Sequence, residues 1–203
     1  MEAAKYLGIT IQNNLSFDRH IQDEASRANS RLGFLKRNLK GVPSSLKRTA
    51  YISLVRSGLE YGAAVWDPHT RDHKRKVELV QNRAMRWICD LPPFDRSSIS
   101  TLQKKTHLDS LENRRRDARL TLMFKVVHNH VAISPQDLGL ESADVRTRAT
   151  HKHKFRERGS RKDLLKHSFV VRTVPQWNRL PASVAEAVSV DSFKAQLTAA
   201  HRP

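Results

Sequence analysis

The stretch Tyr51-Ile-Ser-Leu-Val-Arg-Ser-Gly-Leu-Glu-Tyr-Gly-Ala-Ala-Val-Trp-Asp-Pro68 decides how this chain folds. Its apolar and small residues recur at intervals of three and four, which is typical of a helix with a wide buried face. Gly58 and Gly62 lie one turn apart on this expected helix. Because glycine inside a helix costs about 1 kcal/mol relative to alanine, we expect another backbone to pass close to them. The Asp-Pro pair ends the helix, since a residue before proline avoids the α region. The sequence therefore predicts a central, buried helix.

The charge of the chain is its most unusual property. The 203 residues carry 37 Lys and Arg against 20 Asp and Glu, a net charge of +17, while 38% hydrophobic residues are enough to bury a core. Such an excess indicates a polyanionic partner, nucleic acid before a membrane surface. The alternative is a surface that serves only solubility.

The cysteine content and the apolar runs bear on where the protein works. The single cysteine, Cys89, excludes an internal disulfide and a cysteine-rich zinc site, and its apolar neighbours favour a place in the core. No apolar run approaches the roughly 20 residues that span a bilayer, and the N-terminus lacks the apolar core of a secretory signal. We expect no membrane association and an intracellular location, nuclear or cytoplasmic.

The N-terminal segment predicts a hairpin followed by a long helix. Residues 6–12 are rich in β-branched and aromatic side chains, and Asn13-Asn14 reads as a turn leading to residues 15–17. Ser16 or Asp18 is the expected helix cap. The helix then carries a continuous apolar stripe, formed by Ile21, Ala25, Ala28, Leu32, Leu35 and Leu39. Basic residues lie off this stripe, so the solvent side is expected to be basic.

The remaining pattern is also mainly helical. Ser44 and Asp109 are plausible caps for further helices, another helix is expected to start at Thr70, and a shorter helix is expected from about residue 98 to 105. The helix after Asp109 would bury Leu111, Ala118, Leu122 and Val126. Residues 132–144 lose this periodicity, and residues 146–172 carry ten Lys or Arg against two acidic residues. The predicted fold is a mainly α helical bundle with a short N-terminal β-hairpin and a basic, partly irregular C-terminal subdomain.

Catalytic and metal-binding alternatives find little support in the sequence. The pairs His128/His130 and His151/His153 contain good zinc ligands, but only a pair on a strand would share a face. There is no Gly-x-Ser-x-Gly elbow and no glycine-rich phosphate loop. Stacking on bases is an alternative for the tryptophans, but apolar stripes or a neighbouring proline favour core packing for all three, Trp66, Trp87 and Trp177. No metal and no cofactor are expected on this chain.

Three stretches, in this order and spacing, resemble one protein family. They are Lys5-Tyr6-Leu7-Gly8-Ile9 with Leu15-Ser16-Phe17, then Leu59-Glu60-Tyr61-Gly62 with Val65-Trp66-Asp67-Pro68, and finally Ser168-Phe169, Trp177-Asn178-Arg179-Leu180-Pro181 and Ser192-Phe193-Lys194. Together they are similar to the C-terminal part of the reverse transcriptase polyprotein of non-LTR (LINE-type) retrotransposons. The resemblance covers essentially the whole chain.

The resemblance implies a place for each segment. Residues 1–18 would be a remnant of the palm and primer-grip region, with Tyr6, Leu7 and Gly8 in the primer-grip hairpin. Residues 19–131 would form a helical, thumb-like bundle, and residues 132–203 a basic C-terminal extension. The family's polymerase holds two metal ions with a paired-aspartate motif, whereas this sequence has no Asp-Asp pair. Two-metal phosphoryl transfer needs carboxylates converging on ions about 4 Å apart, so we expect this chain alone not to be catalytic.

Two main functional hypotheses follow. The first is a module that binds the backbone of template and primer, whether RNA, DNA or an RNA–DNA hybrid. A palm domain supplied in trans is a further candidate partner. The residues expected to bind nucleic acid are Arg19, Arg27, Arg31, Lys36, Arg37, Lys40, Lys47, Arg48, Arg114, Arg115, Arg116, Arg119, Lys152 and Lys154. The second is a protein-interaction scaffold that self-associates through the unpaired strand edge of the hairpin. A decayed element without a selected function is the third hypothesis.

Overall fold

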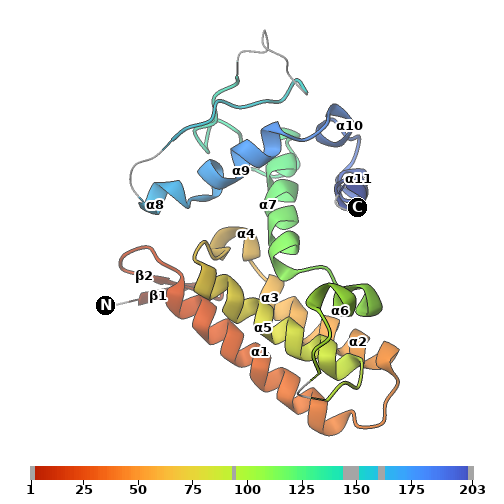
Figure 1. Ribbon diagram of the computed structural model, residues 1–203. Helices are drawn as coiled ribbons and strands as arrows, with labels where there is room; N and C mark the ends of the chain where they lie inside the picture. Colours follow the sequence, from red (N-terminus) through yellow and green to blue (C-terminus); the bar gives the residue numbers. More distant parts are fainter. Residues whose placement is uncertain (1–2, 93–94, 144–150, 160–162, 201–203) are drawn as a thin grey trace. The chain divides into compact units, whose positions relative to one another are not determined.

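The computed structural model describes residues 3–92, 95–143, 151–159 and 163–200, and it is mainly α-helical, as predicted (Figure 1). The chain divides into two compact units, Met1–Arg115 and Arg116–Pro203. Each unit has its own apolar core. The division falls earlier than residue 132, where the composition changes, because the helix that crosses it contributes side chains to both cores.

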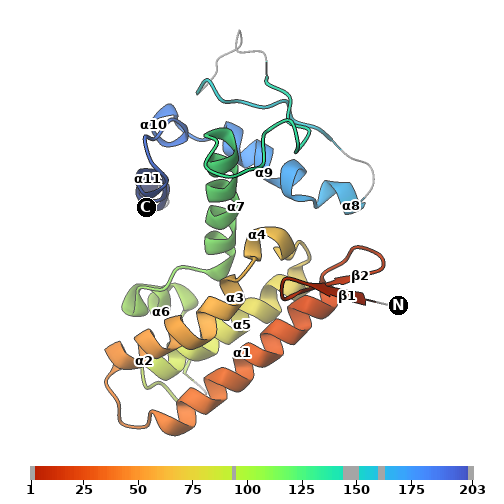
Figure 2. The same cartoon turned by 180° about the vertical axis from the view of Figure 1, so that it is seen from behind.

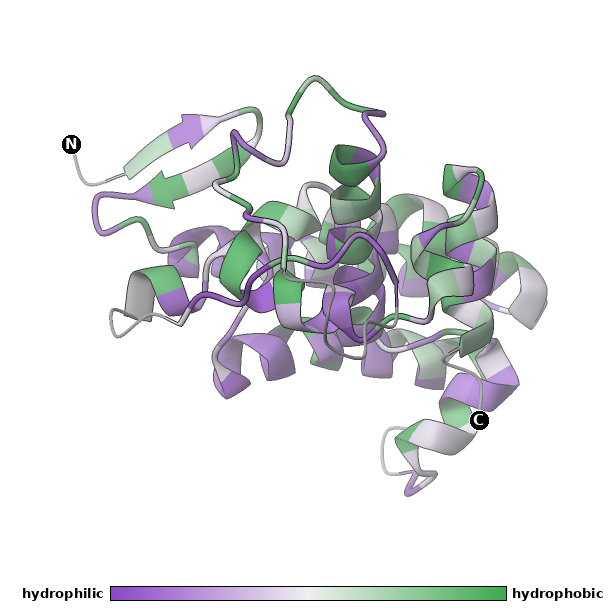
Figure 3. Ribbon diagram, turned by 90° about the horizontal axis from the view of Figure 1, so that it is seen from above, coloured by the Kyte–Doolittle hydropathy of each residue, from purple (hydrophilic) through white to green (hydrophobic). Residues whose placement is uncertain are grey.

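The N-terminal hairpin is present, but its turn lies elsewhere than expected. Strands β1 (Ala3–Tyr6) and β2 (Ile9–Gln12) pair antiparallel, with Tyr6 opposite Ile9. Leu7 and Gly8 form the turn, and both have positive φ (46° and 84°), as two-residue hairpins require. The Asn13-Asn14 turn instead leads out of β2. Apolar and polar residues alternate along β2, visible as green and pale bands in Figure 3.

Helix α1 (Asp18–Asn38) buries the predicted stripe from Ile21 to Leu35. Its cap differs from the prediction, because neither Ser16 nor Asp18 caps it. The Oε1 atom of Gln12, at the end of β2, instead accepts a hydrogen bond from the Arg19 amide (3.1 Å). The hairpin therefore supplies the polar group that satisfies the start of the helix.

The stretch from Tyr51 to Pro68 is not one helix. It continues α2 (Ser44–Tyr51) through a π-helical turn, η1 (Ile52–Arg56), into α3 (Ser57–Glu60), breaks at Tyr61 and Gly62, and resumes as α4 (Ala63–Trp66). Buried residues recur every fourth position, at Lys47, Tyr51, Val55, Leu59 and Ala63. An α-helix has about 3.6 residues per turn, so a period of four would drift off one face. The wider π turn offsets this drift.

The two glycines of the stretch have different roles from the predicted close approach of a backbone. Gly62 adopts a left-handed conformation (φ 60°) that ends α3, and a Cβ there would lie 2.8 Å from Cδ1 of Ile9. Gly58 is helical, and a Cβ there would lie 2.6 Å from Nη1 of Arg31. Side chains, not a backbone, approach both positions, so the prediction was wrong on this point.

Helices α1 and α5 (Arg71–Ile88) lie side by side in Figures 1 and 2 and run parallel. Asp18 pairs with His73 near their starts (3.4 Å), and Asn29 accepts from Arg83 farther along (2.9 Å). Helix α5 starts at Thr70 as predicted, and the Thr70 side chain caps it by accepting from the His73 amide. Helix α6 (Ile99–Thr106) completes the core, whose largest members include Leu32, Tyr51, Leu59, Trp66, Met85, Leu102 and Leu111. Trp66 is therefore a core residue, while Trp87 and Cys89 are partly buried at its margin.

Helix α7 (Leu111–Val127) begins in the first unit, where Ser110 rather than Asp109 accepts from the Asn113 amide (3.1 Å). The predicted stripe holds at its ends, but Ala118 and Leu122 are only half-buried. In the second unit the helix buries Leu120, Met123 and Phe124 instead. The further helices are α8 (Asp163–Lys166), α9 (Phe169–Asn178), α10 (Ala182–Ala185) and α11 (Val190–Ala200).

Residues Trp177 and Asn178 organise the second unit. Trp177 is fully buried, and its indole donates to the His153 carbonyl (2.7 Å). Asn178 accepts from the Phe155 amide (3.0 Å) and donates to the carbonyl of the same residue (2.7 Å). Its side chain thus pairs with an extended segment as a neighbouring strand would, which fixes residues 151–155 against α9.

Candidate nucleic-acid interface

The acidic residues of the stretch from Tyr51 to Pro68 form ion pairs with the start of α7. Glu60 accepts from Arg114 through both carboxylate oxygens, one of them from Nη2 at 3.0 Å. Asp67 accepts from Nε of Arg115 at 2.8 Å, and this pair is buried, with side chains 5% and 1% exposed. Arg114 and Arg115 were expected to face nucleic acid. The structure instead places them in contacts that anchor the start of α7 to the end of α3 and α4.

Three predicted binding residues are buried, which corrects the expectation that they lie on the solvent side. Lys47, Arg115 and Arg119 are 2%, 1% and 4% exposed. Lys47 pairs with Asp90, and Arg119 donates to Thr173 and Gln176 (3.4 and 3.2 Å). A buried charge must be paired or hydrogen-bonded within the protein, so these cations serve the fold and cannot reach a phosphate without local opening.

The predicted basic residues of α1 are not gathered on one face. Arg27 pairs with Glu24 on the same helix, and Arg31 lies over Gly58 on α3. Lys36 lies on the opposite flank, beside Arg83 of α5. Arg19, Arg37 and Lys40 are exposed. The helix therefore offers cations on two flanks, and the flank of Lys36 meets Arg83 of α5.

Further basic residues are on α5, and they were not among the binding residues expected from the sequence. Its solvent side carries Arg71, Arg75, Lys76 and Arg83, all exposed. Within the part of the chain that the structure describes, Arg71, Arg75 and Lys76 make no hydrogen bond or ion pair with protein groups. The signal was present in the sequence, where the cations of this helix avoid its apolar positions.

We define the α1/α5 basic surface as Lys36, Arg37, Lys40, Arg75, Lys76 and Arg83. No Asp or Glu occurs between Glu24 and Glu60, so the α1 side of this surface has no acidic residue of its own, while α5 carries the exposed Asp72 and the half-buried Glu78. Glu78, on α5, accepts a hydrogen bond from the Glu112 amide (2.7 Å). Burial lowers the pKa of the Lys36 ammonium, and the nearby Arg83 charge lowers it further. The smaller of the two causes shows that the Lys36 and Arg83 charges lie close enough to repel each other.

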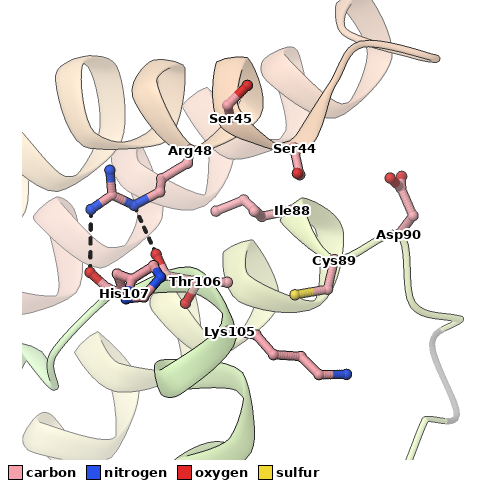
Figure 4. Close-up of a pocket in the computed structure, with 9 residues that line it drawn as sticks. All are labelled: Ser44, Ser45, Arg48, Ile88, Cys89, Asp90, Lys105, Thr106 and His107. Carbon is pink, nitrogen blue, oxygen red and sulfur yellow. Dashed lines mark hydrogen bonds between the residues drawn. The ribbon is translucent and has the colours of Figure 1, made fainter.

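Arg48 contributes to a different feature, a cavity of about 490 Å³ shown in Figure 4. Its guanidinium donates to the carbonyls of Thr106 and His107 (2.7 and 3.3 Å), so it caps the end of α6. Cys89 also lines the cavity, and burial raises the pKa of its thiol. A protonated thiol is a poor nucleophile.

The predicted residues of the second unit have mixed settings. Arg116 contacts the neighbouring Asp117 (3.4 Å), and Lys152 lies 3.6 Å from Glu186. Lys154 is half-buried on the segment that Asn178 fixes. Residues 144–150 and 160–162 of the most basic segment lie outside the described residues, so the expected surface there is only partly visible.

The hairpin turn presents apolar side chains to solvent. Tyr6 and Leu7 are 70% and 71% exposed, and Gly8 allows the turn its positive φ. The Tyr61 hydroxyl donates to the Leu7 carbonyl (3.0 Å) and fixes the turn against the break between α3 and α4. The three residues that resemble a primer grip therefore form one anchored, exposed turn.

The histidines mainly contact backbone groups and rings. His128 and His151 place Nε2 near the carbonyls of Ala185 and Trp177 (3.0 and 3.1 Å). Among the described residues, no group of three or more His, Cys, Asp or Glu side chains could hold a metal ion. No helix within these residues is long and apolar enough to cross a membrane.

Comparison with known proteins finds similarity to RNA-directed DNA polymerases of mobile elements. The chain is 31% identical over 112 residues to a probable RNA-directed DNA polymerase from transposon BS of Drosophila melanogaster, which is 54% of this chain and 12% of that protein. It is 25% identical over 131 residues to the probable RNA-directed DNA polymerase from transposon X-element of the same species, 63% of this chain and 13% of that protein. It is 30% identical over 99 residues to the RNA-directed DNA polymerase from mobile element jockey, also from that species, 47% of this chain and 11% of that protein.

About half of the chain is homologous to retrotransposon RNA-directed DNA polymerases. This distant, partial homology confirms the resemblance to the non-LTR elements that the sequence motifs indicated. The chain spans only about an eighth of the length of these polymerases. No protein-family model matches the sequence, and no solved structure is detectably similar to it.

Proposed function

We propose that this chain is a non-catalytic part of a retrotransposon RNA-directed DNA polymerase, its thumb and C-terminal extension, and that it binds the backbone of template and primer. The observation that carries the proposal is the α1/α5 basic surface, where exposed cations have few protein partners. Exposed cations without protein partners bind a polyanion favourably, because their binding releases the counterions condensed on the phosphates. The homologues' names supply the class of polyanion.

Two features favour backbone binding over base recognition. The surface consists of flexible Lys and Arg side chains on rigid helices, which suits phosphate contacts. Trp66 and Trp177 are buried in the two cores and cannot stack on bases. We therefore expect duplex RNA, DNA or a hybrid to bind with little sequence preference. The chain lacks an adjacent aspartate pair, so a palm domain joined to it or supplied in trans would have to provide the metal-binding carboxylates.

The test is binding of an RNA–DNA hybrid duplex, followed by fluorescence anisotropy as the salt concentration rises. The variant Lys76→Glu/Arg83→Glu reverses two charges of the α1/α5 basic surface. Its control, Arg179→Glu/Lys194→Glu, makes the same change of net charge at exposed positions of the second unit. Each lost phosphate contact should reduce the log–log salt slope by about 0.9.

We expect the α1/α5 variant to bind the duplex at least tenfold more weakly. Its salt slope should correspond to about two fewer phosphate contacts, and the control variant should change little. An equal loss in both variants would mean that net charge alone matters. Absence of binding by the unaltered chain at low salt would overturn the proposal.

A second candidate function is association through the hairpin. It is favoured by the exposed side chains of Tyr6 and Leu7 and by the solvent-exposed residues Ala4 and Lys5 on β1. By the same resemblance, this turn would contact the primer end in an intact polymerase. Light scattering and duplex-binding measurements on the unaltered chain and on Tyr6→Ser/Leu7→Ser distinguish self-association from contact with the primer. A dimer that the variant abolishes supports association, whereas a monomer with weakened duplex binding supports the primer contact.

A further inference from the structure

His20 lies on α1 where the hairpin meets the helices, and its side chain is buried. Its Nδ1 atom is 3.4 Å from the Thr10 amide of β2. A backbone N–H can only donate, so Nδ1 must be the acceptor and the ring proton must sit on Nε2. Nε2 is buried without a hydrogen-bond partner in the described structure. Only a neutral ring satisfies this arrangement, because an imidazolium would carry a proton on each nitrogen.

The ring also belongs to a line of contacts that ends at the hairpin turn. It stands edge-on to Trp66, with ring centroids 5.3 Å apart and an interplanar angle of 73°. The Trp66 indole donates to the Tyr61 carbonyl (2.8 Å), and the Tyr61 hydroxyl donates to the Leu7 carbonyl (3.0 Å). Displacing the His20 ring would therefore disturb the hairpin at two places, the Thr10 amide on β2 and the turn at Leu7.

Charged groups around the ring come from two elements. Asp23, Glu24 and Arg27 share its helix, and Lys5 faces it from β1. From β2 it meets the Thr10 amide, and from α4 the Trp66 indole. The pKa of His20 is lowered, mainly by burial: the carboxylates of Glu24 and Asp23 raise it, Arg27 and Lys5 lower it, and the lowering effects prevail. The docked hairpin thus opposes protonation.

We propose that His20 is a proton-sensitive latch, which holds the β1–β2 hairpin on the first unit when neutral and releases it when protonated. Once the hairpin is released, the ring is open to water and titrates near its ordinary pKa of about 6.5. Docking is then fully favoured above this pH and weakens as the pH falls below it. The docking equilibrium changes by at most tenfold per pH unit, until the lower pKa of the docked state is reached.

Other hairpin contacts do not titrate in this range. Ile9 lies over Gly62, and Gln12 accepts from the Arg19 amide. The Gln12 contact keeps the connection between β2 and α1 in place, so the latch acts on the turn and the strands. The inference concerns the attachment of the hairpin and stands whether or not the chain binds nucleic acid.

The experiment measures hydrogen-exchange protection factors of the Thr10 and Ile11 amides in the full chain between about pH 5 and 8. Protection factors remove the intrinsic pH dependence of exchange. We expect protection to fall by up to tenfold per pH unit below about pH 6.5. In His20→Asn the amide oxygen can accept from Thr10 without titrating, so the dependence should flatten. His107→Asn is the control, since asparagine tolerates its left-handed backbone (φ 51°).

The control should keep the unaltered pH dependence. Protection that does not vary with pH in the unaltered chain, or that varies equally in His20→Asn, overturns the latch. If His20→Asn is unfolded by circular dichroism, the titration of the His20 ring by NMR in the unaltered chain decides the question. A ring pKa at or above 6.5 would overturn the proposal, and a lower one coupled to the Thr10 amide shift would support it.

Discussion

The cations of α7 and those of α5 look alike in the sequence but have opposite surroundings in the structure. Arg114 and Arg115 on α7 bind Glu60 and Asp67, and Arg119 is buried against α9. On α5 the exposed side chains of Arg71, Arg75 and Lys76 have no protein partner among the described residues, and Arg83 donates only to the neutral Asn29. Both helices are rich in arginine, yet one set stabilises the fold and the other is available to a ligand.

This difference shows that charge density alone does not identify a binding surface. What separates the two helices is the position of distant acidic residues. Glu60 and Asp67 lie 54 and 48 residues before their partners in the sequence, and the fold brings each pair together. Asp72 is exposed on α5, but among the described residues no ion pair joins it or any other carboxylate to Arg75 or Lys76. A cation is a candidate for ligand binding when folding leaves it without such a partner.

The largest expected effect is on the buried pair. Asp67→Ala leaves the Arg115 guanidinium buried without its carboxylate, which should lower the free energy of unfolding by about 3–5 kcal/mol. Arg75→Ala, on α5, should change it by less than about 0.5 kcal/mol. Chemical denaturation of both variants measures the contrast. Similar effects in the two would mean that the α7 arginine is not a structural residue.

The next effect concerns the break that places Glu60 and Asp67 on either side of Gly62. Gly62→Ala must hold alanine at φ 60° and displace Ile9, so we expect a loss of about 1–2 kcal/mol. Gly58→Ala is the control. It gains up to about 1 kcal/mol of helix propensity and displaces only the flexible end of Arg31. Thermal unfolding should separate the two; a greater loss for Gly58→Ala would contradict this assignment.

The Glu60–Arg114 pair should matter less, because its side chains are 28% and 35% exposed. Solvent screens the two charges, although the bidentate geometry strengthens the contact. A double-mutant cycle with Glu60→Gln and Arg114→Gln should give a coupling of about 1 kcal/mol. A coupling energy as large as that of the buried Asp67–Arg115 pair would show that solvent exposure does not determine how strongly these ion pairs stabilise the fold.

The smallest expected effect is on Lys36. Since its folded pKa is lowered, stability should increase as pH rises from that value towards the ordinary 10.5 of the unfolded chain. Arg83→Gln removes one cause, so the pKa of Lys36 should move back up while burial keeps it below the ordinary value. NMR titration of the Lys36 side chain checks this. An unchanged pKa would mean that the two cations do not repel each other.

Much of the fold follows from sequence periodicity. The apolar stripe of α1 and the start of α5 at Thr70 were predicted because both depend on residues close together in the chain. The hairpin turn at Leu7-Gly8 was missed, because Asn13-Asn14 is the stronger turn signal and Leu7 rarely adopts a positive φ. The π turn and the break at Gly62 were missed because a four-residue period resembles an α-helix over short lengths.

The candidate site was less predictable. Whether Lys47 or Arg115 is exposed depends on Asp90 and Asp67, whose positions only the tertiary fold determines. Conversely, Lys36 was among the binding residues expected from the sequence but Arg83 was not, although the two residues are neighbours in the fold. Local patterns locate the outer side of a helix, but they do not show which cations are neutralised there.

The most direct test of the central claim is to map backbone amide shifts by NMR while an RNA–DNA hybrid duplex is added to the full chain. We predict that shifts concentrate in the second half of α1 and along α5, around Lys36, Lys76 and Arg83, and that the amides of Arg114 and Arg115 stay unchanged. Shifts centred on α7, with α5 unaffected, would contradict the assignment of the two arginine-rich helices.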